Sequence, residues 1–286
     1  TYSFRKLKGG EINYSFKIET DTGFVLMRVF RYDSWPKEDT LRFVEEKLKK
    51  LGIRQSKIIY LDSSNKYFQN GFMVAEWIEG IPGEEAIRRE IVSEQIVVEK
   101  VARILKKIHT IKFKQFGTPP FNKNNKGFKD FVSFVLHFDG ENRLEKLAKE
   151  GLTPGDLINL GKNLLRRLVG KINFKVNPVM VHGDATPHNI IWREREPVLV
   201  DWEDVKATSW VYDLAWMSYW YGEKVQEPFF KGYGEIDIRM DWFKLLEKIF
   251  HLRLSLGLLP YYAYDIKRRE SLESTIKKLK DIIQNM

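Results

Sequence analysis

The chain contains no cysteine. This absence excludes disulfide bonds, thiolate nucleophiles, cysteine-ligated zinc and iron–sulfur clusters. The chain has only five histidines, and none of them forms a His-Glu-x-x-His pair, which disfavours a zinc hydrolase of that type. No apolar run approaches the roughly 18 residues that span a membrane, so we expect no membrane partner.

Long runs of like charge are also missing, although the formal net charge of the 286 residues is +9. The basic clusters lie far apart, with acidic residues between them: Lys106-Lys107, Arg166-Arg167, Lys267-Arg268-Arg269 and Lys277-Lys278. Dispersed charges are typical of a solvated surface. A nucleic-acid-binding protein would gather them on one face, so we expect no nucleic-acid partner.

The first residues show no basic segment followed by an apolar core, so no signal peptide is visible. Together with the lack of cysteine, this leads us to expect a cytoplasmic protein. The sequence does not begin with methionine, which leaves a trimmed leader open.

The first third of the sequence has the alternation and the β-branched runs of strands. Strands are expected at residues 12–18, 24–30, 57–61 and 72–77. The first two should form a hairpin, because Asp21-Thr22-Gly23 between them are turn residues. One helix is predicted to start near residue 40, because an apolar helical pattern begins there and ends at Gly52.

Helical patterns dominate from about residue 84 onward. A stripe on one helix face should point into the core, and it consists of Val97, Val101, Ile104, Leu105 and Ile108. Short strand-like segments interrupt the helices at 179–181, 190–192 and 198–200. We predict an α+β protein with a small antiparallel β-rich lobe at residues 1–79 and a larger, mainly helical lobe at 80–286.

The most informative segment is Val181-His182-Gly183-Asp184, followed by Asn189 after four intervening residues. This Asp-x-x-x-x-Asn spacing is that of a kinase catalytic loop. An aspartate carboxylate can orient a substrate hydroxyl and accept its proton. An asparagine carbonyl oxygen is a hard, neutral ligand for Mg²⁺.

A second carboxylate follows twelve residues later, where the apolar strand Val198-Leu199-Val200 ends in Asp201. In kinases, an aspartate at this place binds the Mg²⁺ that bridges the nucleotide phosphates. Asn189 and Asp201 therefore predict a Mg²⁺ site whose remaining ligands are phosphate and water.

These motifs resemble those of the aminoglycoside phosphotransferase / choline kinase family, a branch of the protein-kinase-like fold. His182-Gly183-Asp184 with Asn189, then Asp201-Trp202-Glu203 and Asp213-Leu214-Ala215, follow the order and spacing of that family from about residue 7 to about 222. The resemblance implies a two-lobe, protein-kinase-like fold and an ATP- and Mg²⁺-dependent enzyme, with Asp184 as its catalytic residue.

The resemblance also assigns residues to the nucleotide. Gly9 and Gly10 resemble the phosphate-binding loop, where glycine lets backbone N–H groups approach phosphates closely. Arg28 stands where protein kinases carry a phosphate-binding lysine. Its carboxylate partner should come from the first helix, and we favour Glu45, with Glu46 as the alternative.

Glu76, Trp77 and Ile78 resemble the hinge between the lobes. Their backbone would hydrogen-bond the adenine of ATP. Because a hinge reads the base through its backbone, GTP remains an open alternative.

Several other residues near the motifs should support the site rather than react. His182 should hydrogen-bond the backbone of the loop, and Asp213 should hold the loop by accepting hydrogen bonds. His188 is expected to be a loop residue beside the metal. His109, at the end of an apolar stripe, should belong to the core or to an interface.

Acidic and aromatic residues bear on the acceptor. Asp139, Glu141, Glu203, Asp204 and Glu223 are candidates to line an acidic cleft. An aromatic group follows the metal-binding strand: Trp202, Trp210, Tyr212, Trp216, Tyr219, Trp220 and Tyr221. Such residues could form a cage for a quaternary ammonium group. We favour core packing, for which Tyr212, Trp216 and Trp220 have helical spacing.

We expect a phosphotransferase that moves the γ-phosphate of ATP to a hydroxyl of a small molecule, resembling the aminoglycoside phosphotransferases. The alternatives are a choline, ethanolamine or other metabolite kinase and, from a different class, a nucleotide-binding module without catalysis. The presence of both Asp184 and Asn189 disfavours the module. A monomer and a homodimer are equally compatible with the sequence.

Overall fold

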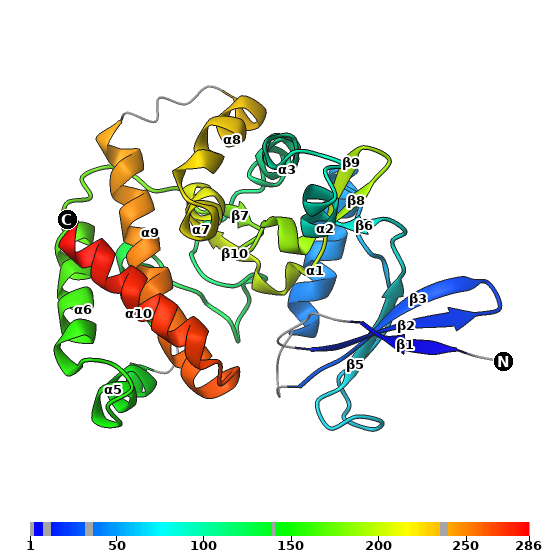
Figure 1. Cartoon of the computed structure of the whole chain (residues 1–286), viewed down its shortest axis with the longest axis horizontal. Coiled ribbons are helices and arrows are strands. Elements are labelled where there is room, and N and C mark those ends of the chain that lie inside the picture. The colour runs from blue at the N-terminus through cyan, green and yellow to red at the C-terminus, as the bar shows by residue number, and fades with distance from the viewer. Residues whose placement is uncertain (1–2, 8–12, 32–36, 139–140, 235–239, 286) are drawn as a thin grey trace.

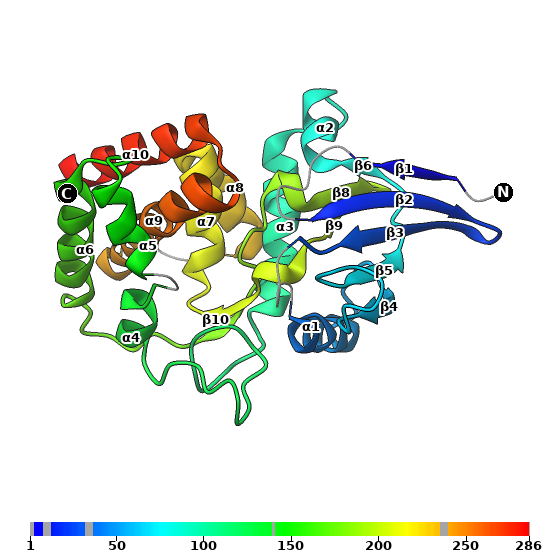
Figure 2. The same cartoon turned by 90° about the horizontal axis from the view of Figure 1, so that it is seen from below.

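The computed structural model describes residues 3–7, 13–31, 37–138, 141–234 and 240–285. The chain forms a β-rich lobe and a larger helical lobe (Figure 1; Figure 2). The predicted α+β, protein-kinase-like architecture is confirmed. The boundary at residues 79 and 80 stays a prediction.

The β-rich lobe contains a five-stranded antiparallel sheet with the strand order β1-β2-β3-β5-β4. Its strands are β1 (Phe4–Lys6), β2 (Tyr14–Thr20), β3 (Gly23–Val29), β4 (Ile58–Asp62) and β5 (Phe72–Glu76). The predicted β2–β3 hairpin is present, with Thr20 opposite Gly23, and Gly23 takes the positive φ of +126° that the tight turn requires. This hairpin carries Arg28 toward the second lobe.

One helix, α1 (Glu38–Lys50), packs against this sheet (Figure 2). Its Leu41 joins a small buried cluster with Phe30, Met73 and Ala75 of the β-rich lobe. Its Val44 belongs to the core of the larger lobe. The amphipathic pattern of the helix therefore serves both lobes and fixes one against the other.

Two short sheets frame the segment that connects the lobes. β6 (Ile81–Pro82) pairs with β8 (Ile190–Arg193), which pairs with β9 (Glu196–Leu199). β7 (Val179–Val181) pairs with β10 (Lys206–Thr208). The loop between β7 and β8 is thus held on both sides by strands.

The larger lobe is mainly helical. Its helices are α2 (Gly83–Arg88), α3 (Glu94–Ile108), α4 (Phe131–Leu136), α5 (Glu141–Lys149), α6 (Gly155–Val169), α7 (Val211–Tyr221), α8 (Gln226–Tyr233), α9 (Asp241–Pro260) and α10 (Arg269–Gln284). The predicted stripe on α3 is confirmed, since Val97, Val101, Leu105 and Ile108 are fully buried and Ile104 is partly buried against the same core. Within the described residues, no helix is long and apolar enough to cross a membrane.

A π-helical turn, Tyr261–Asp265, continues α9 beyond Pro260. Proline lacks the backbone N–H of a regular helix, and π-helical turns are frequent at functional sites. Side chains of this turn line one cavity together with residues of the loop between β7 and β8, as described next.

Candidate active site

The loop after β7 is held by a single buried carboxylate. Asp213 of α7 accepts hydrogen bonds from the backbone N–H groups of His182 (3.0 Å) and Gly183 (2.8 Å). Gly183 has a φ of +93°, and a Cβ there would lie 2.2 Å from the carbonyl oxygen of Asp204. Only glycine fits this position, because both its backbone angle and the space exclude a side chain.

His182 supports the loop from inside, as the sequence suggested. Its Nε2 lies 3.1 Å from the carbonyl oxygen of Val200, and its Nδ1 accepts the backbone N–H of Asp184 at 3.2 Å. Its ring packs on Trp202, with 4.3 Å between ring centroids. Burial lowers the pKa of His182, which keeps the imidazole neutral and suited to these two bonds.

His109 also acts on Asp213. Its Nε2 lies 3.0 Å from the Asp213 carboxylate, and its Nδ1 lies 2.8 Å from the hydroxyl of Tyr233. His109 is buried, so its predicted place in the core is confirmed. The link ties α3 and α8 to the helix that holds the loop.

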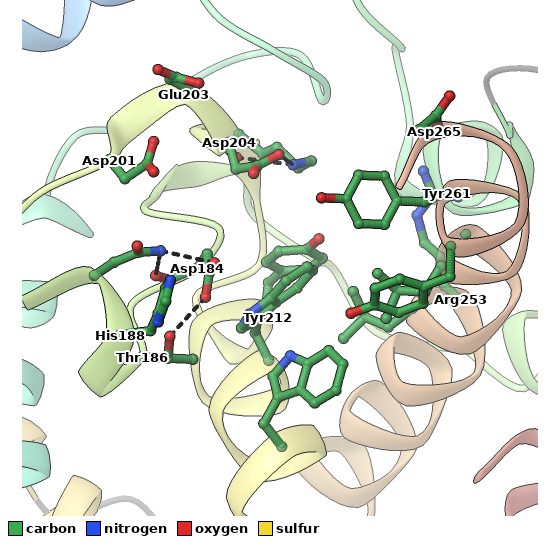
Figure 3. A pocket seen from close by; sticks show the side chains of 18 of the residues that line it. Asp184, Thr186, His188, Asp201, Glu203, Asp204, Tyr212, Arg253, Tyr261 and Asp265 are labelled. Atoms are coloured by element: carbon green, nitrogen blue, oxygen red, sulfur yellow. Dashed lines mark hydrogen bonds and ion pairs between the residues drawn. The ribbon is translucent and has the colours of Figure 1, made fainter. Parts of the chain in front are cut away.

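Asp184 points into a cavity from the end of this loop (Figure 3). Its carboxylate accepts bonds from the Thr186 hydroxyl (3.0 Å) and from the Asn189 amide nitrogen (2.8 Å). Burial, reinforced by the nearby carboxylates of Asp204 and Asp201, raises the pKa of Asp184 to about 7. A carboxylate with that pKa can exchange protons near neutral pH.

Asn189 and Asp201 line the same cavity as Asp184. The backbone N–H of Val200 donates to the main-chain carbonyl oxygen of Asn189 at 3.0 Å. This bond joins the segment that carries Asn189 to the segment that carries Asp201. Asp201 takes a left-handed backbone conformation, with φ and ψ both 63°, at the end of its strand. Such conformations cluster at functional sites in proteins.

Arg28 of β3 reaches across to these carboxylates. Its two terminal nitrogens lie 3.2 and 3.1 Å from the Asp201 carboxylate oxygens, and one of them lies 2.9 Å from Glu203. The Asn13 amide nitrogen donates to Glu203 at 2.9 Å. The two acidic partners raise the pKa of Arg28 despite its burial, whereas burial raises the pKa of Glu203 to about 8.

The predicted pairing of Arg28 with Glu45 is wrong. Glu45 accepts the backbone N–H of Ile58 at 2.9 Å, and Glu46 pairs with Lys50 on the surface of α1. Arg28 pairs with Asp201 and Glu203 of the other lobe instead. The sequence reasoning named Glu203 only as an acidic lining candidate and missed this role.

The other residues that were predicted to bind the nucleotide either do not line the cavity or lie outside the residues that the structure describes. Gly9 and Gly10 lie outside the described residues. Glu76, Trp77 and Ile78 follow one another at the end of β5, but they do not line the cavity that contains Asp184. The backbone N–H of Glu76 is already bonded to the carbonyl oxygen of Lys57 at 2.8 Å.

The cavity has a volume of about 880 Å³ and extends from Arg28 to the carboxy-terminal helices. Of the predicted acidic lining, Glu203 and Asp204 are present, and Glu223 is not part of its lining. Asp139 and the side chain of Glu141 lie outside the described residues. The far wall comes from α9 and the π-helical turn (Figure 3), which contribute Arg253, Tyr261 and Asp265, none of which the sequence reasoning named.

The favoured core interpretation of the aromatic group is correct for Trp202 and Tyr219, which are buried. It is wrong for Trp220, which is exposed and lines the cavity, whereas Trp216 and Tyr221 pack against the core and also line the cavity. Tyr212 does both, since it is buried in the core and faces the cavity. Helical spacing predicted that these aromatic residues share one face of α7, but it could not predict that this face borders a cavity.

Comparisons with known proteins place the chain among phosphate-transferring enzymes. The model of the phosphotransferase enzyme family matches residues 3–246. A search of curated protein sequences gives no match. The fold is similar to that of a thermostable mutant of aminoglycoside phosphotransferase APH(4)-Ia, solved as a ternary complex with AMP-PNP and hygromycin B. The identity is 13% and the TM-score 0.74, over 99% of this chain and 93% of that one.

Two further solved structures are similar over nearly the whole chain. One is a putative fructosamine-3-kinase from Thermobifida fusca, with 18% identity and a TM-score of 0.64, over 98% of this chain and 93% of that one. The other is a choline/ethanolamine kinase family protein from Mesorhizobium loti, with 17% identity and a TM-score of 0.67, over 99% of this chain and 88% of that one. At these identities the likeness shows a shared fold.

Proposed function

The chain belongs to the phosphotransferase enzyme family, and we propose that this small-molecule kinase moves the γ-phosphate of ATP, with Mg²⁺, to a hydroxyl group of its acceptor. The family that the sequence motifs resemble is thereby confirmed. The observation that carries the finer proposal is the convergence of Asp184, Asn189 and Asp201 on one cavity that Arg28 also lines.

Asp184 is the proposed catalytic base. Its two carboxylate oxygens are oriented by Thr186 and Asn189, so an acceptor hydroxyl in the cavity would meet a fixed group. The acceptor proton would pass to a carboxylate oxygen of Asp184 as the hydroxyl oxygen bonds to the γ-phosphorus and the bond between that phosphorus and the bridging oxygen breaks, which releases ADP. A raised pKa near 7 makes Asp184 a better base than an ordinary aspartate, whose pKa is 3.8.

Asn189 and Asp201 fit Mg²⁺ by their chemistry. The Asn189 amide nitrogen is committed to Asp184, which leaves its carbonyl oxygen to serve as a ligand beside the Asp201 carboxylate. Among the residues that the structure describes, no three His, Cys, Asp or Glu side chains gather as a metal cluster. Mg²⁺ commonly takes one or two protein carboxylates and completes its shell with phosphate and water, so this donor set is sufficient. When bound, the ion would neutralise charge on the transferring phosphate.

Arg28 would steady the phosphates while holding Asp201 in place. Its two bonds to Asp201 fix the carboxylate from the opposite lobe. The adenine ring of ATP would be bound by backbone groups of the hinge. Trp77 and Ile78 are better candidates than Glu76, because the backbone N–H of Glu76 is already bonded within the β-rich lobe. Backbone recognition leaves GTP as an alternative to ATP. The need for either nucleotide favours the cytoplasm as the site of the reaction.

The solved relatives suggest what acceptors the fold can carry. The APH(4)-Ia complex holds hygromycin B, and the Mesorhizobium loti relative is assigned to choline and ethanolamine kinases. For this chain we propose a small-molecule hydroxyl in the part of the cavity between Asp184 and the π-helical turn.

ADP release from MgATP tests the function. Wild-type protein and Asp184→Ala are assayed against aminoglycosides, macrolides, choline, ethanolamine, homoserine and sugars. Asp156→Ala, which changes an exposed aspartate on α6, is the matched control. Acceptor-stimulated release that Asp184→Ala loses and Asp156→Ala keeps supports the proposal. Nucleotide binding, detected as a raised melting temperature, without release for any acceptor would favour the non-catalytic module. Undiminished release by Asp184→Ala would refute the assignment of the base.

A further inference from the structure

A lysine of the chain itself occupies the acidic and aromatic corner next to Asp184. The ammonium group of Lys206, on β10, donates to the carbonyl oxygen of Asp204 at 2.9 Å and lies 3.4 Å from its carboxylate. The same ammonium lies 5.7 Å from the ring centroid of Tyr212. A carboxylate and an aromatic face are the two groups that a protein uses to bind a substrate ammonium.

This corner is next to the reacting groups and faces the cavity. Asp204, Lys206 and Tyr212 all line it, and the charge of Asp204 is one cause of the raised pKa of Asp184. The Lys206 side chain is 23% exposed and that of Asp204 is 38% exposed. Tyr212 and Asp204 raise the pKa of Lys206 although burial opposes them, so Lys206 stays charged.

The remaining charges of this part of the cavity do not restore an acidic site. Asp265 is paired with Arg143 at 2.8 Å. Glu84, which also lines the cavity, accepts a hydrogen bond from the Tyr221 hydroxyl at 3.2 Å and lies 3.5 Å from His188. Arg253 brings a second cation to the lining and donates to the carbonyl oxygens of Val135 and His137, each at 2.6 Å. Figure 3 shows Asp204 and Tyr212 on one side and Arg253 and Asp265 on the other. An ammonium acceptor would therefore meet carboxylates that already have partners, together with two cations.

The rest of the acceptor wall is apolar. Trp216, Trp220, Tyr261 and Tyr262 bring aromatic rings to it, and Leu254 and Leu258 bring aliphatic side chains. Aromatic faces and aliphatic groups bind apolar surface without a charge requirement. The volume of about 880 Å³ leaves room for a bulky molecule beside the nucleotide phosphates.

We propose that the acceptor is an uncharged hydroxyl compound with a bulky apolar body, and that Lys206 determines this specificity by filling the cation position between Asp204 and Tyr212 with its own ammonium group. The inference rests on the proposed function, because it concerns the acceptor of the same phosphoryl transfer. Lys206 is a specificity residue here and takes no part in the chemistry.

Three alcohols of similar size and different charge test this inference. They are 3,3-dimethylbutan-1-ol, which is neutral, choline, which is cationic, and 2-hydroxyethanesulfonate, which is anionic. Binding is followed through the tryptophan fluorescence of the full chain, since Trp216 and Trp220 line the cavity. Wild-type protein should bind the neutral alcohol more tightly than either charged one.

Lys206→Met should free the corner, so that choline binds at least about tenfold more tightly than to wild type. Lys206→Arg keeps a cation there and should keep the wild-type order. Lys224→Met removes an exposed lysine that pairs with Glu94 outside the cavity, and it serves as the matched control with the wild-type order. A melting-temperature shift with MgATP shows that each variant is folded.

Each other pattern overturns the inference. Wild-type protein that prefers choline has an available cation site, and preference for 2-hydroxyethanesulfonate would mean an anionic acceptor. Unchanged choline binding in folded Lys206→Met would remove Lys206 as the determinant. No response to the neutral alcohol in any variant would refute the apolar acceptor wall. ADP release is measured separately, so binding in the expected order without phosphoryl transfer would count against the proposed function alone.

Discussion

Asp184 is the proposed catalytic base and lies in an environment that opposes its charge, and replacing it with asparagine should separate the two effects. The carboxylate has a pKa of about 7, against an ordinary value of 3.8, because burial and the carboxylates of Asp204 and Asp201 oppose its charge. In Asp184→Asn the carbonyl oxygen can still accept from Asn189, and the Thr186 hydroxyl can turn to accept from the new amide. We expect the variant to lose activity and gain stability.

The magnitude follows from the pKa. Moving a carboxyl pKa from 3.8 to about 7 corresponds to about 4 kcal/mol against the folded state once Asp184 is ionised. Because the cavity admits solvent, which screens the charge, we expect about half of that limit, or about 2 kcal/mol. For a chain of this size, such a gain raises the melting temperature by about 4–8 °C.

The sign of the pH dependence is fixed by the direction of the pKa. The folded state binds the Asp184 proton more tightly than the unfolded state, so the wild-type stability falls between about pH 4 and 7 as this group ionises. The stability difference between Asp184→Asn and wild type should therefore be smaller at pH 5, which lies only about one unit above the ordinary pKa, than at pH 8. Differential scanning calorimetry at both values measures it. ADP release should fall by about 10²–10⁴-fold in the variant.

A melting temperature of Asp184→Asn at or below that of wild type at pH 8 would refute the reasoning from burial. An equal difference at pH 5 and pH 8 would also count against it, because the cause would then not be ionisation. Asp156→Asn, on an exposed face of α6, should change neither the stability nor its pH dependence and serves as the control.

Three further perturbations follow from the site. Arg28→Met should reduce the free energy of unfolding by about 3 kcal/mol, because it removes the cation from the buried Glu203 and from the partly exposed Asp201, and adding Glu203→Gln should recover part of the loss in urea denaturation. Gly183→Ala should lower the urea midpoint of unfolding and should reduce ADP release at least tenfold, because the added Cβ would collide with the carbonyl oxygen of Asp204 and shift Asp184. ADP release equal to that of wild type would contradict this reasoning. EDTA should abolish ADP release and excess Mg²⁺ should restore it, whereas activity that survives EDTA would exclude the proposed Asn189 and Asp201 site.

The loop that carries the proposed base could be predicted from the sequence because its parts are close together in the chain. Asp184 and Asn189 lie five positions apart, and the hydrogen bond between their side chains is set by the local turn. The apolar segments on either side form strands that hold the ends of the loop. Spacing and residue type together were therefore enough to place these two side chains at one cavity.

The partners of Arg28 could not be predicted in the same way. Arg28 and Asp201 are 173 positions apart, and their contact depends on how closely the two lobes approach each other. From the sequence alone, a carboxylate on the first helix and a carboxylate after β9 are equally reasonable partners for Arg28. The structure decides between them because the Glu45 carboxylate is already bonded to the backbone of Ile58.

The acceptor wall shows a second kind of limit, which comes from pairing rather than distance. A sequence count of Glu203 and Asp204 as acidic lining assigns each a full negative charge, and that count favours a cationic acceptor. In the structure the charge of Asp204 is offset by Lys206, two positions along, and Glu203 is engaged by Arg28. The field that an acceptor meets is set by what remains after these pairs form. For this reason the proposed acceptor end of the cavity has to be interpreted from its own contacts.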